Sequence, residues 1–144
     1  MDKKKEVILS VFFLLNAVNG RTFLQKFFYL LNREIFAERL FNYKPYKYGP
    51  FSQDINIEIS ELEKDDLIEE NRVLIKGKGI AYSYALTSKG RDTAKKIFND
   101  NLSPDERTSL IDYTNQFREF SPTQLLKYVY EKYPEVTENS VFEG

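Results

Sequence analysis

The sequence predicts a mostly α-helical (α+β) fold, a winged helix-turn-helix with a two-stranded β-wing and additional C-terminal helices. Three observations predict it. A helical run to residue 66, which Ser52 can cap, carries one apolar stripe with i, i+4, i+7 spacing. Two segments rich in β-favouring residues, 72–75 and 80–86, then flank a glycine-punctuated turn. A new helix capped by Thr87 completes the order of helix, hairpin and helix.

The other elements of the N-terminal part follow from apolar spacing and from chain breakers. The apolar residues near the N-terminus are too many for one narrow stripe, so the first helix is expected to be buried on most sides. Asn19-Gly20 ends it. Helices are predicted over 3–16, 22–32 and 88–99, and an extended, aromatic-rich segment over 40–48.

Two capping signals predict the helices of the last third of the chain. Ser103-Pro104-Asp105-Glu106 opens a helix to about residue 117, and Ser121-Pro122-Thr123-Gln124 opens another that stops at Tyr133-Pro134. This last helix is rich in aromatic residues and would either form a homodimer or partner surface or cap the core. We divide the chain into a winged-helix domain, 1–99, and a helical extension packed on it, 100–144.

The composition indicates one globular domain and a narrow range of chemistry. The chain has 144 residues, of which 42% are hydrophobic, enough for one core. It has no cysteine, so it forms no disulfide and offers no thiolate, and no histidine, the commonest metal ligand and general base. Gly77 and Gly79 lie in the predicted hairpin and not between a strand and a helix, as a phosphate loop requires. We therefore expect no enzyme activity, no metal and no cofactor.

Charge and hydropathy limit the partners of the chain. The formal net charge is −1, so attraction to nucleic acid must come from a local patch. No stretch reaches the roughly 20 apolar residues that a membrane span needs. Asn16 interrupts the N-terminal apolar run, and no small-residue cleavage site follows it. We expect a cytoplasmic protein that does not bind membranes.

Three stretches follow the pattern of a known family. Residues 20–31 read GRTFLQKFFYLL, residues 46–52 read YKYGPFS, and residues 61–68 read ELEKDDLI. They resemble the "LQK-x-x-YLL" and "YGPYS…LE-x-x-GLI" segments of the SocA/Panacea antitoxin-like, phage-associated family. Residues 86–90, LTSKG, also match an "LT-x-KG" step common after the wing of winged-helix regulators. The resemblance covers about residues 20 to 98 and departs at Asp66, where the family has Gly.

The resemblance implies a winged-helix-like domain that acts as an antitoxin, a proteolytic adaptor or a regulator, and not as an enzyme. The first hypothesis from the residues is a DNA-binding transcriptional regulator or antitoxin-like protein that binds double-stranded DNA. Helix 52–66 would then enter the major groove. It carries six acids against one lysine, however, so only its N-terminus could approach DNA favourably.

Lysines beside glycines or tyrosines offer better contacts to nucleic acid. The same lysines also suit a soluble hairpin turn, and the tyrosines could instead pack with only their hydroxyls exposed. The candidate nucleic-acid-binding residues are Lys44, Tyr46, Lys47, Ser52, Gln53, Asn56, Lys76 and Lys78.

The second hypothesis is a protein-interaction module that does not bind nucleic acid. In helix 52–66 four acids follow one face, and a basic toxin or adaptor could bind there if the face is exposed. A single helix face does not supply the converging ligands of a cation site, so we predict no metal there. The candidate partner-binding residues are Asp54, Glu58, Glu61 and Asp65.

Overall fold

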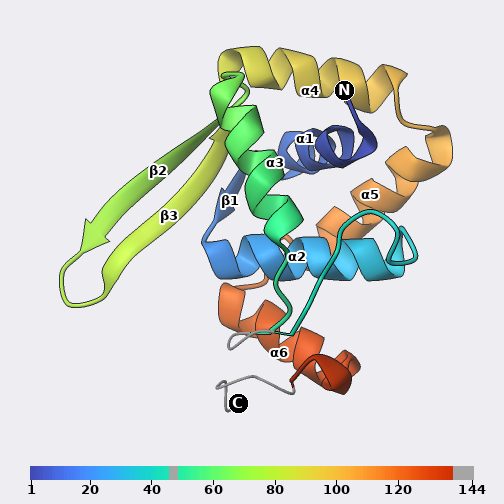
Figure 1. Cartoon of the computed structure of the whole chain (residues 1–144). Coiled ribbons are helices and arrows are strands. Elements are labelled where there is room, and N and C mark those ends of the chain that lie inside the picture. The colour runs from blue at the N-terminus through green and yellow to red at the C-terminus, as the bar shows by residue number, and fades with distance from the viewer. Residues whose placement is uncertain (46–48, 138–144) are drawn as a thin grey trace.

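A computed structural model describes residues 1–45 and 49–137, and the statements below concern these residues. This part of the chain forms six α-helices, one short 3-10 helix and a three-stranded antiparallel sheet (Figure 1). The mostly α-helical α+β class is therefore confirmed. Among the described residues, no helix is both long and apolar enough to cross a membrane.

Helices and short strands alternate in the N-terminal part. Its elements are α1 Lys3–Leu15, β1 Ala17–Asn19, α2 Arg21–Glu34, α3 Gln53–Lys64, β2 Ile68–Ile75 and β3 Gly79–Leu86. Helices then follow one another: α4 Ser88–Asp100, α5 Pro104–Phe117, α6 Pro122–Lys132 and the 3-10 helix Pro134–Thr137.

The sheet has the order β1-β3-β2, so the predicted two-stranded wing has a third strand. β1 pairs with β3 through Val18 opposite Tyr84. The prediction missed β1 because three residues are too few to show a period of two. β2 begins at Ile68 rather than at residue 72. The distal halves of β2 and β3 project together from the helices as an arm (Figure 1).

The capping signals of α4, α5 and α6 are confirmed. Thr87 Oγ1 accepts a hydrogen bond from Gly90 N at 2.9 Å. Ser103 and Ser121 each form the predicted capping box with the third residue of the following helix. These helices begin where predicted because a cap depends only on residues within one turn.

The two main motif stretches meet in the fold, where α2 holds the segment before α3. The Gln25 amide donates to Ser52 O at 3.0 Å and accepts from Ser52 N at 2.8 Å. Lys26 Nζ donates to Pro50 O at 3.1 Å. A Cβ at Gly49 would lie 3.0 Å from Lys26 Cε, so the turn needs a glycine there. The prediction that Ser52 caps α3 is wrong, since its side chain makes no capping hydrogen bond.

One hydrophobic core joins all six helices. α1 lies at its centre and is buried on most sides, as predicted, with Ile8 and Phe12 fully buried. α5 packs on α1 and α6 packs on α2, and they contribute Leu110, Phe117 and Val129 to the same core. α6 thus covers the core through its apolar side, while its use as a dimer surface and the domain boundary at residue 99 stay predictions.

Candidate nucleic-acid interface

The acidic flank of α3 is neutralised inside the molecule. Glu58 is buried, and its Oε2 accepts a hydrogen bond from Lys5 Nζ at 2.6 Å. Glu61 Oε2 accepts from the same nitrogen at 3.2 Å, and Asp54 Oδ2 lies 3.7 Å from Lys4 Nζ. The hydrogen bond that Lys5 donates to Glu58, and then the one that it donates to Glu61, raise the pKa of Lys5 well above its ordinary value. Two lysines of α1 therefore pair with these three acids, which leaves one net negative charge on the flank.

The fourth predicted acid lies apart from this flank. Asp65 ends α3 and is exposed, and its backbone oxygen accepts a hydrogen bond from Lys89 Nζ at 3.1 Å. The four candidate partner-binding residues thus do not form one exposed acidic face, which the protein-interaction hypothesis required. No local sequence signal indicates this pairing, because the partners of the acids lie on α1.

The outward face of α3 consists mainly of uncharged side chains. It lies opposite the buried Ile55, Ile59 and Leu62, and its members recur with the i, i+3, i+4, i+7 spacing of one helix face. They are the exposed residues Gln53, Asn56, Ile57 and Ser60. Glu63 and Lys64 follow them and have opposite charges. Of the six acids of the helix, Glu63, Asp65 and Asp66 are exposed, so the acids that it presents to solvent lie toward its C-terminal end.

Solvent exposure differs among three candidate residues at the start of α3. Gln53 is exposed at the first position of α3, and Asn56 is exposed one turn later. Asn56 Oδ1 accepts a hydrogen bond from Gln25 Nε2 at 3.3 Å, which orients its amide. Ser52, in contrast, is fully buried with both backbone groups bonded to Gln25, so its side chain is not available to a ligand.

An arginine–tyrosine cluster lies beside this face. Arg21, the first residue of α2, stacks its guanidinium 3.6 Å above the centre of the Tyr82 ring, and its Nε donates to Tyr84 Oη at 3.3 Å. Arg72 lies opposite Tyr82 in the β2–β3 ladder and donates to Glu70 Oε1 at 2.7 Å. Both arginine side chains remain more than half exposed. The prediction missed them because neither lies in a basic run.

A groove of about 450 Å³ separates α3 from this cluster. Asn56, Ser60 and Glu63 line it from α3, while Arg21 and Arg72 line it from the opposite side. Burial, and then the nearby carboxylate of Glu70, raise the pKa of Glu63. The groove therefore has mixed charge, with exposed guanidinium groups along one side.

The lysine candidates lie in separate places, so they do not form the single basic surface that phosphate contact by all of them requires. Lys76 and Lys78 are exposed at the turn of the hairpin, and neither forms an ion pair with any residue that the structure describes. Lys44 is exposed as well, and its backbone bonds to Phe51. The turn lies at the end of the projecting arm, apart from the segment before α3 (Figure 1). The two other candidates of that segment, Tyr46 and Lys47, lie outside the described residues.

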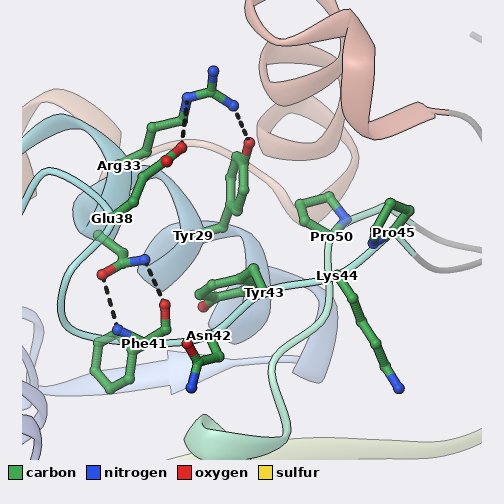
Figure 2. A pocket seen from close by; sticks show the side chains of 10 residues that line it. Tyr29, Arg33, Glu38, Phe41, Asn42, Tyr43, Lys44, Pro45 and Pro50 are labelled. Atoms are coloured by element: carbon green, nitrogen blue, oxygen red, sulfur yellow. Dashed lines mark hydrogen bonds and ion pairs between the residues drawn. The ribbon is translucent and has the colours of Figure 1, made fainter.

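A second hollow, of about 290 Å³, lies between α2 and the segment that follows it (Figure 2). Its polar groups bond to one another: Arg33 contacts Tyr29 Oη at 2.7 Å and Glu38 at 3.4 Å. Tyr43 donates its hydroxyl to Gln25 O at 3.2 Å, so its ring packs here. Lys44 extends away from Arg33 (Figure 2). Because its polar groups are already paired, we do not assign this hollow a ligand.

The outward face of α3 and the arginine–tyrosine cluster together offer two kinds of contact. Amide and hydroxyl groups can bond to base edges, and guanidinium groups can bond to phosphates.

When compared with models of protein families and with curated proteins, the chain matches none of them.

Proposed function

We propose that the chain is a winged-helix DNA-binding protein without catalytic activity, a transcriptional regulator or an antitoxin-like protein. The order α1-β1-α2-α3-β2-β3, with the sheet order β1-β3-β2, supports the winged-helix assignment. In this arrangement α3 is the second helix of the helix-turn-helix and the hairpin is the wing. The second helix is the one that lies in the major groove in helix-turn-helix proteins.

The observation that carries the proposal is the outward face of α3. A duplex carries one negative charge per roughly 1.7 Å of its axis, so unpaired acids on a recognition helix would oppose binding. Here Lys4 and Lys5 pair with the acidic flank and leave one net negative charge on it, and Glu58 is buried. Gln53 and Asn56 remain exposed, and amide side chains can bond to adenine with both a donor and an acceptor.

Cations beside this face would contact the DNA backbone. Arg21 stands at the N-terminus of α2, whose cap Gly20 has no side chain to bond to the free N–H groups. A helix N-terminus with free N–H groups favours a phosphate. Arg72 on the wing shares the carboxylate of Glu70 with Arg21, and Lys76 and Lys78 are further exposed cations at the hairpin turn.

The alternative, a protein-interaction module that uses the acidic flank of α3 to bind a toxin or an adaptor, has less support. It requires the carboxylates of that flank to be available to a partner, whereas Glu58 and Glu61 both form ion pairs with Lys5. A partner would have to compete with this pair, and breaking a buried ion pair leaves an uncompensated charge.

Fluorescence anisotropy with a mixed pool of labelled duplexes across a salt series tests the proposal. We expect binding that weakens with salt, and a log–log slope about 1 shallower for Arg21→Gln, which removes one phosphate contact. Lys127→Gln is the matched control, because it removes one charge from an exposed position on α6. No binding by the wild type at low salt, or equal slopes for the two variants, would contradict the proposal.

A further inference from the structure

The distal part of the hairpin exposes apolar side chains on both faces. Residues 71–80 are all exposed, and Leu74 is 79% accessible. Leu74 lies opposite Ile80 in the ladder, and Val73 lies opposite Ala81 on the other face. Val73, Ile75 and Ile80 are 58%, 42% and 51% accessible. Grouped exposed apolar side chains of this kind mark interaction sites in soluble proteins.

The outer edge of β2 is also without a partner. β2 is the last strand in the order β1-β3-β2, and no strand in the described part of the chain pairs with its free side. An edge of this length, with Val73, Leu74 and Ile75 in sequence and no proline, is a template for another strand. The hairpin projects from the helices (Figure 1), so a second strand can approach this edge.

We propose that β2 pairs antiparallel with β2 of a second copy of the chain, about a two-fold axis at Val73. β2 is acidic near the helices, at Glu69 and Glu70, and basic at the turn, at Lys76. Antiparallel pairing sets the acidic end of each strand beside the basic end of the other, whereas parallel pairing would set like charges together. This self-complementary charge pattern favours a second copy over an unrelated partner.

The charges also select the register. Directly opposed residues lie on the same face of a sheet, so the two-fold axis must pass through a residue position. An axis at Val73 sets Glu70, which already accepts a hydrogen bond from Arg72 of its own strand, opposite the partner's Lys76. An axis at Leu74 would instead set Arg72 opposite the partner's Lys76, and opposed like charges destabilise a strand pair.

The pairing brings the exposed apolar side chains together. Val73 lies opposite the partner's Val73, and Leu74 lies diagonal to the partner's Leu74, within reach of its side chain. Two-fold contacts in which the same patch is used twice are the commonest way in which soluble chains associate. The pairing assigns Lys76 to a carboxylate in place of the phosphate contact proposed above, and it leaves Lys78 for phosphate.

Cysteine cross-linking tests the register directly, because the natural chain has no cysteine. In this register Val73→Cys brings two thiols to opposed positions and should form a disulfide-linked dimer under mild oxidation. Asn71→Cys, on the same face, is the matched control. Its two thiols would be about 14 Å apart along the strands, too far for a disulfide. Equal cross-linking of the two variants, or none in either while the protein is folded, would overturn the register.

Sedimentation equilibrium without oxidant tests the association itself. We expect a reversible wild-type dimer, and a dissociation constant about tenfold higher for Lys76→Glu, which turns two attractive pairs into repulsive ones. Lys78→Glu makes the same charge change at the other turn lysine and should have a smaller effect, because the proposed register gives Lys78 no opposed carboxylate. A wild type that stays monomeric up to millimolar concentration would overturn the proposal and point to a different protein on this edge.

Discussion

Lys5 of α1 and Glu58 of α3 form an ion pair with 2.6 Å between Nζ and Oε2, although they are 53 residues apart in the chain. Both side chains are largely buried, at 16% and 9% accessible. The buried stripe of Ile55, Ile59 and Leu62 sets the rotation of α3 about its axis, and the ion pair holds the acidic flank toward α1 in that rotation. The electrostatics of the proposed DNA-binding surface therefore depend on a contact inside the protein.

Removal of one partner of this pair should destabilise the fold. Lys5→Met leaves Glu58 buried without a counter-charge, and we expect a loss of about 3 kcal/mol in the free energy of unfolding, measured with urea. Lys4→Met is the control: its pair with Asp54 is 3.7 Å long and more exposed, so the loss should stay below about 1 kcal/mol. A double variant, Lys5→Met with Glu58→Leu, should recover most of the stability. Equal losses for both single variants would contradict the assigned role.

The Gln25 amide should be a second stabilising contact. Gln25→Ala leaves the N–H and the C=O of the buried Ser52 without partners, which should cost about 2 to 3 kcal/mol in thermal or urea unfolding. Gln116→Ala, at an exposed position on α5, should change the stability by less than about 0.5 kcal/mol. If the two substitutions had the same small effect, water would have to replace the Gln25 amide.

Lys26 should make stability depend on pH in the alkaline range. Burial lowers the pKa of Lys26 to about 8 from an ordinary 10.5. Above pH 10.5 the amine is neutral in both the folded and the unfolded state, so its burial does not change the free energy of unfolding. As the pH falls from 10.5 to 8, the unfolded chain binds the proton first, so the folded state loses roughly 3 kcal/mol of stability relative to it. Below pH 8 the loss is complete and constant.

The Lys26→Met variant isolates this effect. The stability of the wild type minus that of the variant should rise by roughly 3 kcal/mol between pH 8 and pH 10.5 in urea titrations. Tyrosines that ionise in the same range are present in both proteins, so their contribution cancels. A difference that stays constant with pH would mean that Lys26 is hydrated in the folded protein.

The end of α3 should improve with a glycine. Asp66 has φ = 60°, in the left-handed region, while its N–H donates to Glu63 O at 3.0 Å and the next N–H donates to Leu62 O at 2.9 Å. Asp66→Gly removes the strain of a Cβ there and should stabilise the protein by about 0.5 to 1 kcal/mol in thermal unfolding. Asp65→Gly, at φ = −83°, should destabilise it instead. If Asp65→Gly stabilised the protein and Asp66→Gly destabilised it, the left-handed conformation assigned to Asp66 would be contradicted.

Elements with local signals were predictable from the sequence. The caps of α4, α5 and α6 depend on side chains within one turn, and the apolar stripe of α3 predicts which side of that helix is buried. Gln53, Asn56, Ile57 and Ser60 could have been found as the face opposite that stripe. What failed depended on distant partners: β1 pairs with a strand more than 60 residues later, the Ser52 backbone bonds to Gln25, and the acids of α3 bond to lysines of α1.

The most direct test of the account adds a charge to the outward face of α3. Asn56→Asp changes the shape of the side chain little and puts one negative charge on that face. Asn115→Asp makes the same change at an exposed position of α5. We predict that Asn56→Asp weakens duplex binding in anisotropy at least tenfold, about 1.4 kcal/mol, and that Asn115→Asp weakens it less than twofold. If both variants lose the same affinity, α3 does not contact the DNA and the account is wrong.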